Sequence, residues 1–123
     1  MLDCGALIAV DRGDKAMMLR LEGARRAGLE LRSNAMVVAQ AWRDARGRQA
    51  GLAGVLGAVD VRAVLPADGR RAGELLGVAG LADAIDASVA LLAGPGDRIL
   101  TSDPADLRRL CEAAGNSATV IPV

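Results

Sequence analysis

The sequence predicts an α/β fold, in which a parallel sheet is covered by helices on both faces. Its 123 residues are enough for a substantial core, and we expect one domain over 1–123. Apolar residues make up 52% of the chain, yet Trp42 is the only aromatic residue. The core must therefore be aliphatic, which suits helices packed on a parallel sheet. Short apolar runs alternate with longer helical segments, as in parallel α/β sheets.

In the first half of the chain, capping residues and glycines set the expected boundaries. Asp14 is a suitable N-cap for a helix, and Gly28 stands just after the end of that helix. Ser33 or Asn34 caps the next helix, whose apolar face includes Trp42. The expected elements are strands over 1–3 and 29–32, a turn at Cys4–Gly5, and helices over 6–10, 15–27, 35–46 and 48–56.

Prolines and glycines also divide the second half. Pro66 closes a strand, Gly80 stops the helix that follows, and Pro104 suits the first position of a helix. The helix that opens at Asp83 is followed by a Gly-Pro-Gly turn and a short apolar strand. The expected elements are strands over 59–65, 98–100 and 118–121, and helices over 67–78, from Asp83 onward, and over 104–114.

The composition excludes several kinds of chemistry. The chain has no histidine, which removes the Ser-His-Asp triad, the Cys-His pair and His-ligated zinc. The formal net charge is zero, which argues against a broad basic face but not against a local basic patch. Cys4 and Cys111 are too few for a disulfide scaffold, so we expect reduced thiols in a cytoplasmic protein. No apolar run approaches the ~18 residues of a membrane span, and no signal peptide is expected.

Acidic residues stand where an α/β protein places its chemistry, at strand ends and helix starts. Asp3 ends the first strand, Asp103 follows the strand over 98–100, and Asp83 and Asp86 open a helix. An acid between an apolar strand and an apolar helix is costly to bury without a partner. We therefore predict that these distant carboxylates converge on a divalent metal.

Three segments carry a resemblance to a known family. They are M-L-D-C-G-A-L-I-A at 1–9, V-V-A-Q-A-W-R at 37–43, and the stretch over 86–107 that runs from D-A-S-V-A-L-L-A through T-S-D-P-A-D-L. In this order they resemble the PIN domain, and in particular the VapC-type toxins of actinobacteria. The resemblance implies a three-layer α/β/α fold with a central parallel sheet of about five strands. In such a sheet the first and fourth strands are neighbours, so Asp3 and Asp103 would lie side by side.

The same resemblance implies a cluster of acids that binds Mg²⁺ or Mn²⁺ and cuts single-stranded RNA. Its first, third and fourth acids fall on Asp3, Asp86 and Asp103. The second acid of the pattern, a Glu, falls on Gln40, whose amide oxygen can ligate a hard cation but carries no charge. Asp44, one helical turn further on, would lie on the same face and could partly substitute.

Other polar residues have both a structural and a functional interpretation. Asp83 and Asp103 are also suitable N-caps, and Asp83 is interpreted mainly as one. Thr101 and Ser102 either hydrogen-bond the carboxylates or a phosphate, or simply end a strand. Cys4 is interpreted as a small core residue rather than a nucleophile. Because they flank Gln40, the arginines that we consider as contacts to RNA phosphates are Arg43, Arg46 and Arg48.

We therefore expect a cytoplasmic, metal-dependent endoribonuclease, the toxin of a type II toxin–antitoxin pair. The expected partners are an RNA substrate, a small antitoxin protein and a second copy in a homodimer, and no membrane. The substitution at Gln40 leaves open a degenerate PIN domain that binds RNA or protein without cutting. A receiver-like phosphoacceptor domain has similar length, but Asp3 has no adjacent acid and no lysine follows Lys15.

Overall fold

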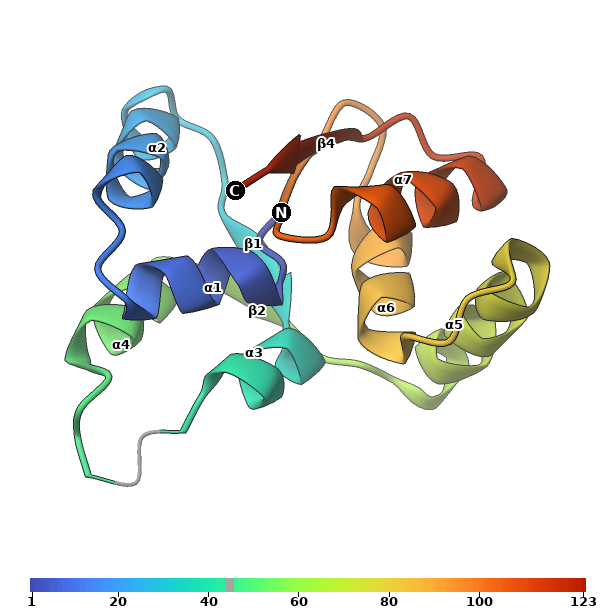
Figure 1. Ribbon diagram of the computed structural model, residues 1–123, viewed down its shortest axis with the longest axis horizontal. Helices are drawn as coiled ribbons and strands as arrows, with labels where there is room; N and C mark the ends of the chain where they lie inside the picture. The colour runs from blue at the N-terminus through green and yellow to red at the C-terminus, as the bar shows by residue number, and fades with distance from the viewer. Residues whose placement is uncertain (44–45) are drawn as a thin grey trace.

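The computed structural model describes residues 1–43 and 46–123 and has an α/β architecture, as predicted. Figure 1 shows α1 to α4 grouped on one side of the molecule and α5 to α7 on the other. The helices of the described part are α1 (Cys4–Asp11), α2 (Lys15–Arg26), α3 (Ala35–Ala41), α4 (Ala50–Leu56), α5 (Pro66–Ala79), α6 (Ala84–Leu92) and α7 (Pro104–Ala113). The strands are β1 (Arg32–Asn34), β2 (Asp60–Arg62), β3 (Arg98–Thr101) and β4 (Thr119–Pro122).

The strands form two parallel ladders rather than one regular central sheet. β1 pairs with β2, and β3 pairs with β4. The segment 1–3 lies between the ladders: Leu2 N donates to Arg32 O (2.7 Å), and Asp3 N donates to Leu100 O (3.1 Å). The prediction of a single central sheet of about five strands is therefore wrong, because the described strands form two separate two-stranded ladders. Because α1 begins at Cys4, the first strand is too short to form more than an isolated bridge between Leu2 and Leu100.

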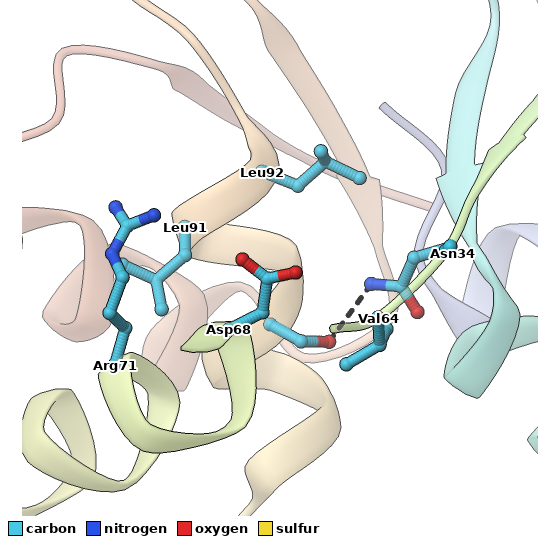
Figure 2. A pocket seen from close by; sticks show the side chains of 8 residues that line it. Asn34, Val64, Asp68, Arg71, Leu91 and Leu92 are labelled. Atoms are coloured by element: carbon cyan, nitrogen blue, oxygen red, sulfur yellow. Dashed lines mark hydrogen bonds between the residues drawn. The ribbon is translucent and has the colours of Figure 1, made fainter. Parts of the chain in front are cut away.

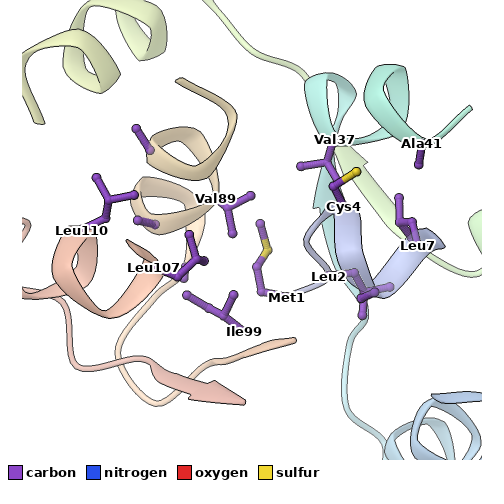
Figure 3. Packing of buried hydrophobic residues seen from close by; sticks show 14 of the residues in the cluster. Met1, Leu2, Cys4, Leu7, Val37, Ala41, Val89, Ile99, Leu107 and Leu110 are labelled. Carbon is purple, nitrogen blue, oxygen red and sulfur yellow. The ribbon is translucent and has the colours of Figure 1, made fainter. Parts of the chain in front are cut away.

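The short central segment contributes to the core on both sides. Successive side chains of an extended chain point in opposite directions. In Figure 3, Met1 accordingly lies near Val89 and Ile99, whereas Leu2 lies on the side of Leu7. The buried cluster is aliphatic, as expected, and both Leu2 and Ile99 are fully buried. Full burial of one such side chain stabilises the fold by about 1.5–3 kcal/mol.

Several predicted boundaries are wrong in informative ways. The turn expected at Cys4–Gly5 is the first turn of α1. The strand expected over 29–32 is displaced to Arg32–Asn34, and Asn34 also caps α3 by accepting from Met36 N and Val37 N. The helix expected over 35–46 ends at Ala41, and Trp42 is its half-exposed C-cap rather than part of its apolar face.

The second-half boundaries follow their capping residues more closely. Pro66 starts α5 rather than preceding it, and Gly80 ends α5 with a positive φ of 66°. The strand expected over 59–65 contracts to the three residues of β2, because only these pair with β1. Within the described residues no single helix is long and apolar enough to cross a membrane. Only α5 and α6 taken together, with a 106° bend between them, meet the length and composition of a span.

An ion pair joins the two ladders at the amino ends of their strands. Arg32 Nη2 donates to Asp97 Oδ1 (2.9 Å) and to Oδ2 (2.7 Å). Asp97 Oδ2 also accepts from Gly94 N at 2.7 Å. Both charged side chains are about three-quarters buried, so solvent weakens their attraction less than it does at the surface. This contact fixes the spacing of β1 and β3 at the end of the strands opposite Asp3.

Candidate functional site

Asp3 occupies the junction between the central segment and α1. It is extended, with φ −87° and ψ 174°, and its side chain is 3% exposed. Asp3 Oδ2 accepts from Thr101 Oγ1 at 2.7 Å. Its other oxygen, Oδ1, is buried and has no hydrogen-bond partner among the described residues. A buried carboxylate oxygen without a partner is unfavourable, so Asp3 is suited to a ligand that supplies one.

The environment of Asp3 favours its protonated form. Burial raises the pKa of Asp3 above its ordinary value, and the negative charges of Asp83 and Asp103 raise it further. The hydrogen bond from Thr101 opposes this rise in pKa. The N–H of Cys4 also opposes it, without completing a hydrogen bond to Oδ1. A cation beside Asp3 would lower its pKa and restore the ionised form.

Asp86 lies in the first turn of α6 and belongs to the same electrostatic neighbourhood. Partial burial, followed by the charges of nearby acids, raises the pKa of Asp86 to about 7. The nearby acids are Asp3, Asp83, Asp103 and Asp106. Perturbed carboxylates of this kind are typical of functional sites. Four of the five acids were singled out from the sequence, and Asp106 was not among them.

Asp83 and Asp103 begin helices but differ in what their carboxylates do. Asp83 Oδ1 accepts from Ile85 N (2.8 Å) and from Asp86 N (3.0 Å), so Asp83 is the N-cap of α6 as predicted. Asp103 stands at the N-cap position of α7 without a side-chain capping bond. Its expected capping role is therefore wrong, and its exposed carboxylate remains available to a ligand.

Thr101 connects the acids on the two sides of the site. Its buried hydroxyl donates to Asp3 Oδ2 and accepts from Asp103 N at 3.0 Å. One hydroxyl thus fixes the orientation of Asp3 and the backbone that carries Asp103. This agrees with the interpretation in which Thr101 hydrogen-bonds one of the carboxylates. Ser102 is exposed and makes no side-chain hydrogen bond in the described part of the chain.

Gly5 lets α1 approach the turn after β3 closely, and the sequence did not reveal its importance. A Cβ at Gly5 would lie 2.6 Å from both Cβ and N of Ser102, well inside van der Waals contact. Only glycine allows this separation without a shift of backbone. The close approach brings Asp3, two residues before Gly5, to the turn that carries Asp103. No pattern in the sequence signals this contact, because Gly5 and Ser102 are distant along the chain.

No described contact links Gln40, at the second position of the expected acid pattern, to this cluster. Gln40 lies in α3, is exposed, and its side chain makes no hydrogen bond to another described residue. Asp44 lies outside the described residues. Within 1–43 and 46–123, no three acidic or thiol side chains already meet in the geometry of a metal site. The acids therefore form an open cluster around Asp3.

Positive charge reaches the same region from the end of α3. Arg43 Nη1 donates to Ala39 O (2.9 Å) and Trp42 O (2.8 Å), which holds the guanidinium against the last turn of the helix. Its charge partly offsets the burial and the Asp3 charge that raise the pKa of Cys4. Cys4 is thus a buried thiol, in agreement with its interpretation as a core residue. Arg46 and Arg48 are exposed on the following loop.

A polar pocket lies between α5, α6 and the end of β1. Its volume is about 150 Å³, and Figure 2 shows Asp68 and Arg71 of α5 on one side and Asn34 on the other. Asn34 Nδ2 donates to Ser88 Oγ at 2.9 Å. The lining residues are Asn34, Ala63, Val64, Asp68, Arg71, Ser88, Leu91 and Leu92. None of the acids around Asp3 lines this pocket, so it is separate from the candidate site.

The residues around Asp3 fit a hard divalent cation. Carboxylate oxygens are the ligands that Mg²⁺ and Mn²⁺ prefer, and Asp3 Oδ1 is left without a partner. Asp86 and Asp103 are not held by side-chain hydrogen bonds in the described structure, so both are available as further ligands.

No family model matches the chain, and no curated protein or solved structure matches it significantly.

Proposed function

We propose that this chain is a metal-dependent endoribonuclease of the PIN type. The observation that carries the proposal is the buried Oδ1 of Asp3, unpaired among the described residues, with nearby acids that raise the pKa of Asp3 and of Asp86. Such an arrangement is unfavourable in isolation and becomes favourable when a divalent cation binds. The three sequence segments that resemble PIN domains supply the reaction class. Cleavage of single-stranded RNA that requires Mg²⁺ or Mn²⁺ and stops in EDTA is the direct test.

Each residue of the cluster has a definite task in this proposal. Asp3, Asp86 and Asp103 would hold the cation, which would supply Lewis acidity toward a phosphate group. Thr101 holds Asp3 in one orientation through the bond to Oδ2, which leaves Oδ1 for the cation. Asp83 fixes the start of α6 and thereby the position of Asp86. Gln40 would add a neutral oxygen ligand or orient a water molecule.

The order of hydrogen-bonded segments supports the PIN-like topology. Taken with the central segment, the sequence of neighbours is β2, β1, residues 1–3, β3 and β4. The first and fourth extended segments are therefore adjacent, which is the arrangement that the resemblance implies. In this interpretation residues 1–3 stand where the central strand of a five-stranded sheet would run, between the two separate ladders. Asp3 and Asp103 then lie at its carboxyl edge, where α/β proteins bind ligands.

Single-stranded RNA is the proposed substrate, because the charge of Arg43 acts on Cys4 beside Asp3, and Arg46 is exposed on the loop that follows. Arginine is the side chain best suited to bidentate phosphate contacts. We further propose a small antitoxin as the partner that controls the enzyme, and a homodimer as its solution form. Exposed apolar side chains on α2 and α5, such as Leu19 (75% exposed) and Val78 (76%), are compatible with protein partners.

The acid cluster predicts that divalent metal stabilises the protein more at pH 7.5 than at pH 5.5. An unfolded aspartate ionises near pH 4, whereas Asp86 in the folded protein ionises near pH 7. The contribution of Asp86 to the free energy of unfolding is therefore fully present below about pH 4, and it is lost as the pH rises to about 7. A bound cation reverses this loss only where the carboxylates are ionised. Since Asp86 is half exposed, we expect an effect on the order of 1–2 kcal/mol.

Thermal unfolding with and without millimolar Mn²⁺ at the two pH values measures this difference. An Asp86→Asn variant is the control, because it should lose most of the pH dependence. Equal stabilisation at both pH values would contradict a metal site that contains Asp86.

The neutral side chain at position 40 favours a second candidate, a PIN domain that binds RNA without cutting it. Gln40→Glu adds one negative charge on an exposed helix position, so the fold should tolerate it. We expect about tenfold tighter Mn²⁺ binding and cleavage at least as fast, because a charged ligand replaces a neutral one. Isothermal titration with Mn²⁺ and an RNA-cleavage assay measure the two effects.

Three outcomes of this substitution are distinguishable. Tighter Mn²⁺ binding with faster cleavage supports a nuclease weakened at its second ligand. Tighter binding without cleavage in either form supports the binding module. Unchanged Mn²⁺ affinity would show that position 40 does not face the carboxylates.

A further inference from the structure

Among the described residues, Arg43 has one edge of its guanidinium group without an acceptor. The backbone carbonyls of Ala39 in α3 and of its C-cap Trp42 accept from Nη1, and no described residue accepts from Nε or Nη2. The Nε–Nη2 edge is the one with which Arg25 holds Glu22, at 3.1 and 3.0 Å. The chain therefore shows, on α2, what this edge binds when an anion is present. In Arg43 the same edge meets no described acceptor and is suited to an anion.

Gln49 fixes the backbone from which Arg43 extends. Its side chain is buried, with only 7% of the residue exposed, although the loop around it is exposed. Gln49 Oε1 accepts from Arg43 N at 2.6 Å, and Nε2 donates to Ala41 O at 3.1 Å. These bonds satisfy the end of α3 and tie it to the start of α4. A long polar side chain is rarely buried unless it satisfies specific backbone groups in this way.

Arg43 extends from a helix that packs against the start of the acid cluster. Helix α3 packs against α1, the helix that begins immediately after Asp3. The Arg43 charge acts on Cys4, the first residue of α1 and the neighbour of Asp3. An anionic group bound at the Arg43 edge would therefore lie on the α3 side of the helix that begins at the acids.

We infer that Gln49 is a positioning residue, which holds the Nε–Nη2 edge of Arg43 as a subsite for a phosphodiester group adjacent to the one that is cut. The inference rests on the proposed ribonuclease function, because it assigns the substrate's neighbouring phosphate to this edge. Holding the phosphate in one place favours productive binding more than the chemical step. Loss of the two hydrogen bonds made by the Gln49 side chain should therefore raise KM and leave kcat nearly unchanged.

The test compares Gln49→Ala, Arg43→Ala and the double variant in steady-state cleavage of a short single-stranded RNA with Mn²⁺. We expect KM to rise about five- to tenfold in each single variant, with kcat within about twofold of the parent protein. If Gln49 acts through Arg43, the double variant should be no worse than Arg43→Ala alone. Arg70→Ala, an exposed arginine on α5, is the control and should leave KM unchanged.

A conservative variant and a local probe separate positioning from general damage. Gln49→Glu keeps an oxygen that can accept from Arg43 N but loses the donor to Ala41 O, so its KM should lie between those of the parent and Gln49→Ala. Trp42 is the only aromatic residue, and its emission reports the segment between the two bonds of Gln49. Adding RNA should change this emission in the parent and much less in Gln49→Ala.

Each result decides between the alternatives. An unchanged KM in Gln49→Ala, or effects of Gln49→Ala and Arg43→Ala that add in full, would overturn the inference while RNA cleavage by the parent still supported the proposed function. A parent protein that neither cleaves RNA nor changes its Trp42 emission with RNA would overturn both. If Gln49→Ala does not fold, Gln49→Glu carries the comparison with Arg43→Ala.

Discussion

An Asp3→Asn variant is expected to lose RNA cleavage and yet to unfold at a higher temperature than the parent protein without metal. The substitution keeps the shape of the side chain and an oxygen that can accept from Thr101 Oγ1. It removes a charge that is buried at 3% exposure and that lies near other acids. Relief of this burial should stabilise the metal-free protein by about 1–3 kcal/mol at pH 7.5. Cleavage should fall by at least about 10²-fold, as when one electrostatic group is removed from a reacting centre.

Two measurements check this prediction, namely thermal unfolding with and without Mn²⁺ and the rate of RNA cleavage. The stabilisation by Mn²⁺ seen in the parent should disappear in the variant, because the buried oxygen no longer carries a charge. Asp11→Asn, at the exposed end of α1, is the matched control and should change neither quantity. A destabilised Asp3→Asn protein would instead identify Asp3 as a structural carboxylate. Cleavage at the parental rate would remove Asp3 from the catalytic site.

A Gly5→Ala variant is expected to damage both the fold and the site by adding a single methyl group. The new Cβ would lie 2.6 Å from the backbone N of Ser102, so α1 or the turn after β3 must move. Overpacking of this kind costs about 1–3 kcal/mol of folding stability. The movement would separate Asp3 from the backbone that carries Asp103, and a displacement of about 1 Å can reduce a rate by about 10²-fold.

Chemical denaturation and the cleavage assay measure these two effects. Gly73→Ala in α5 is the matched control, because a Cβ there meets nothing within 4 Å. In that helix alanine should stabilise the protein by about 0.5–1 kcal/mol, since glycine is a poor helix former. A Gly5→Ala protein as stable and active as the parent would show that α1 and the turn after β3 do not need this close approach.

The helices could be predicted from the sequence because their ends are decided by local chemistry. Asp14 accepts from Met17 N at 2.7 Å, and Asp83 caps α6, as their positions in the sequence indicated. Gly28 and Gly80 both adopt a φ near 70°, which glycine tolerates and other residues avoid. Local signals of this kind do not depend on the rest of the fold.

The strands were harder to predict because three or four residues contain too little periodicity to fix a boundary. β1 was displaced because its register follows from pairing with β2, a contact between residues 28 positions apart, such as Arg32 and Asp60. The end of α3 was missed for a similar reason. Its last turn is completed by Gln49, which lies eight residues beyond Ala41. Neither contact leaves a pattern in the adjacent sequence.

The acids of the candidate site could be identified from the sequence, but the residues that position them were harder to find. Asp3, Asp83, Asp86 and Asp103 were identified from their places at strand ends and helix starts, and their charges do act on one another in the structure. The capping role of Asp103 was wrong because its carboxylate is not aimed at the first turn of α7. The contribution of Gly5 depends on the space beside Ser102, which only the folded chain defines.

The place of Asp3 between the two ladders couples ligand binding to the cohesion of the molecule. The bonds of residues 1–3, with the Ser33 hydroxyl donating to Leu2 O at 2.9 Å, join β1 on one side to β3 on the other. A ligand that orders Asp3 therefore also opposes separation of the two halves, and by reciprocity a force that separates them weakens the ligand. A protein that binds both halves could thus change the ligand affinity of the site without contacting a carboxylate. Residues 1–3 would in this way transmit regulation as well as support the fold.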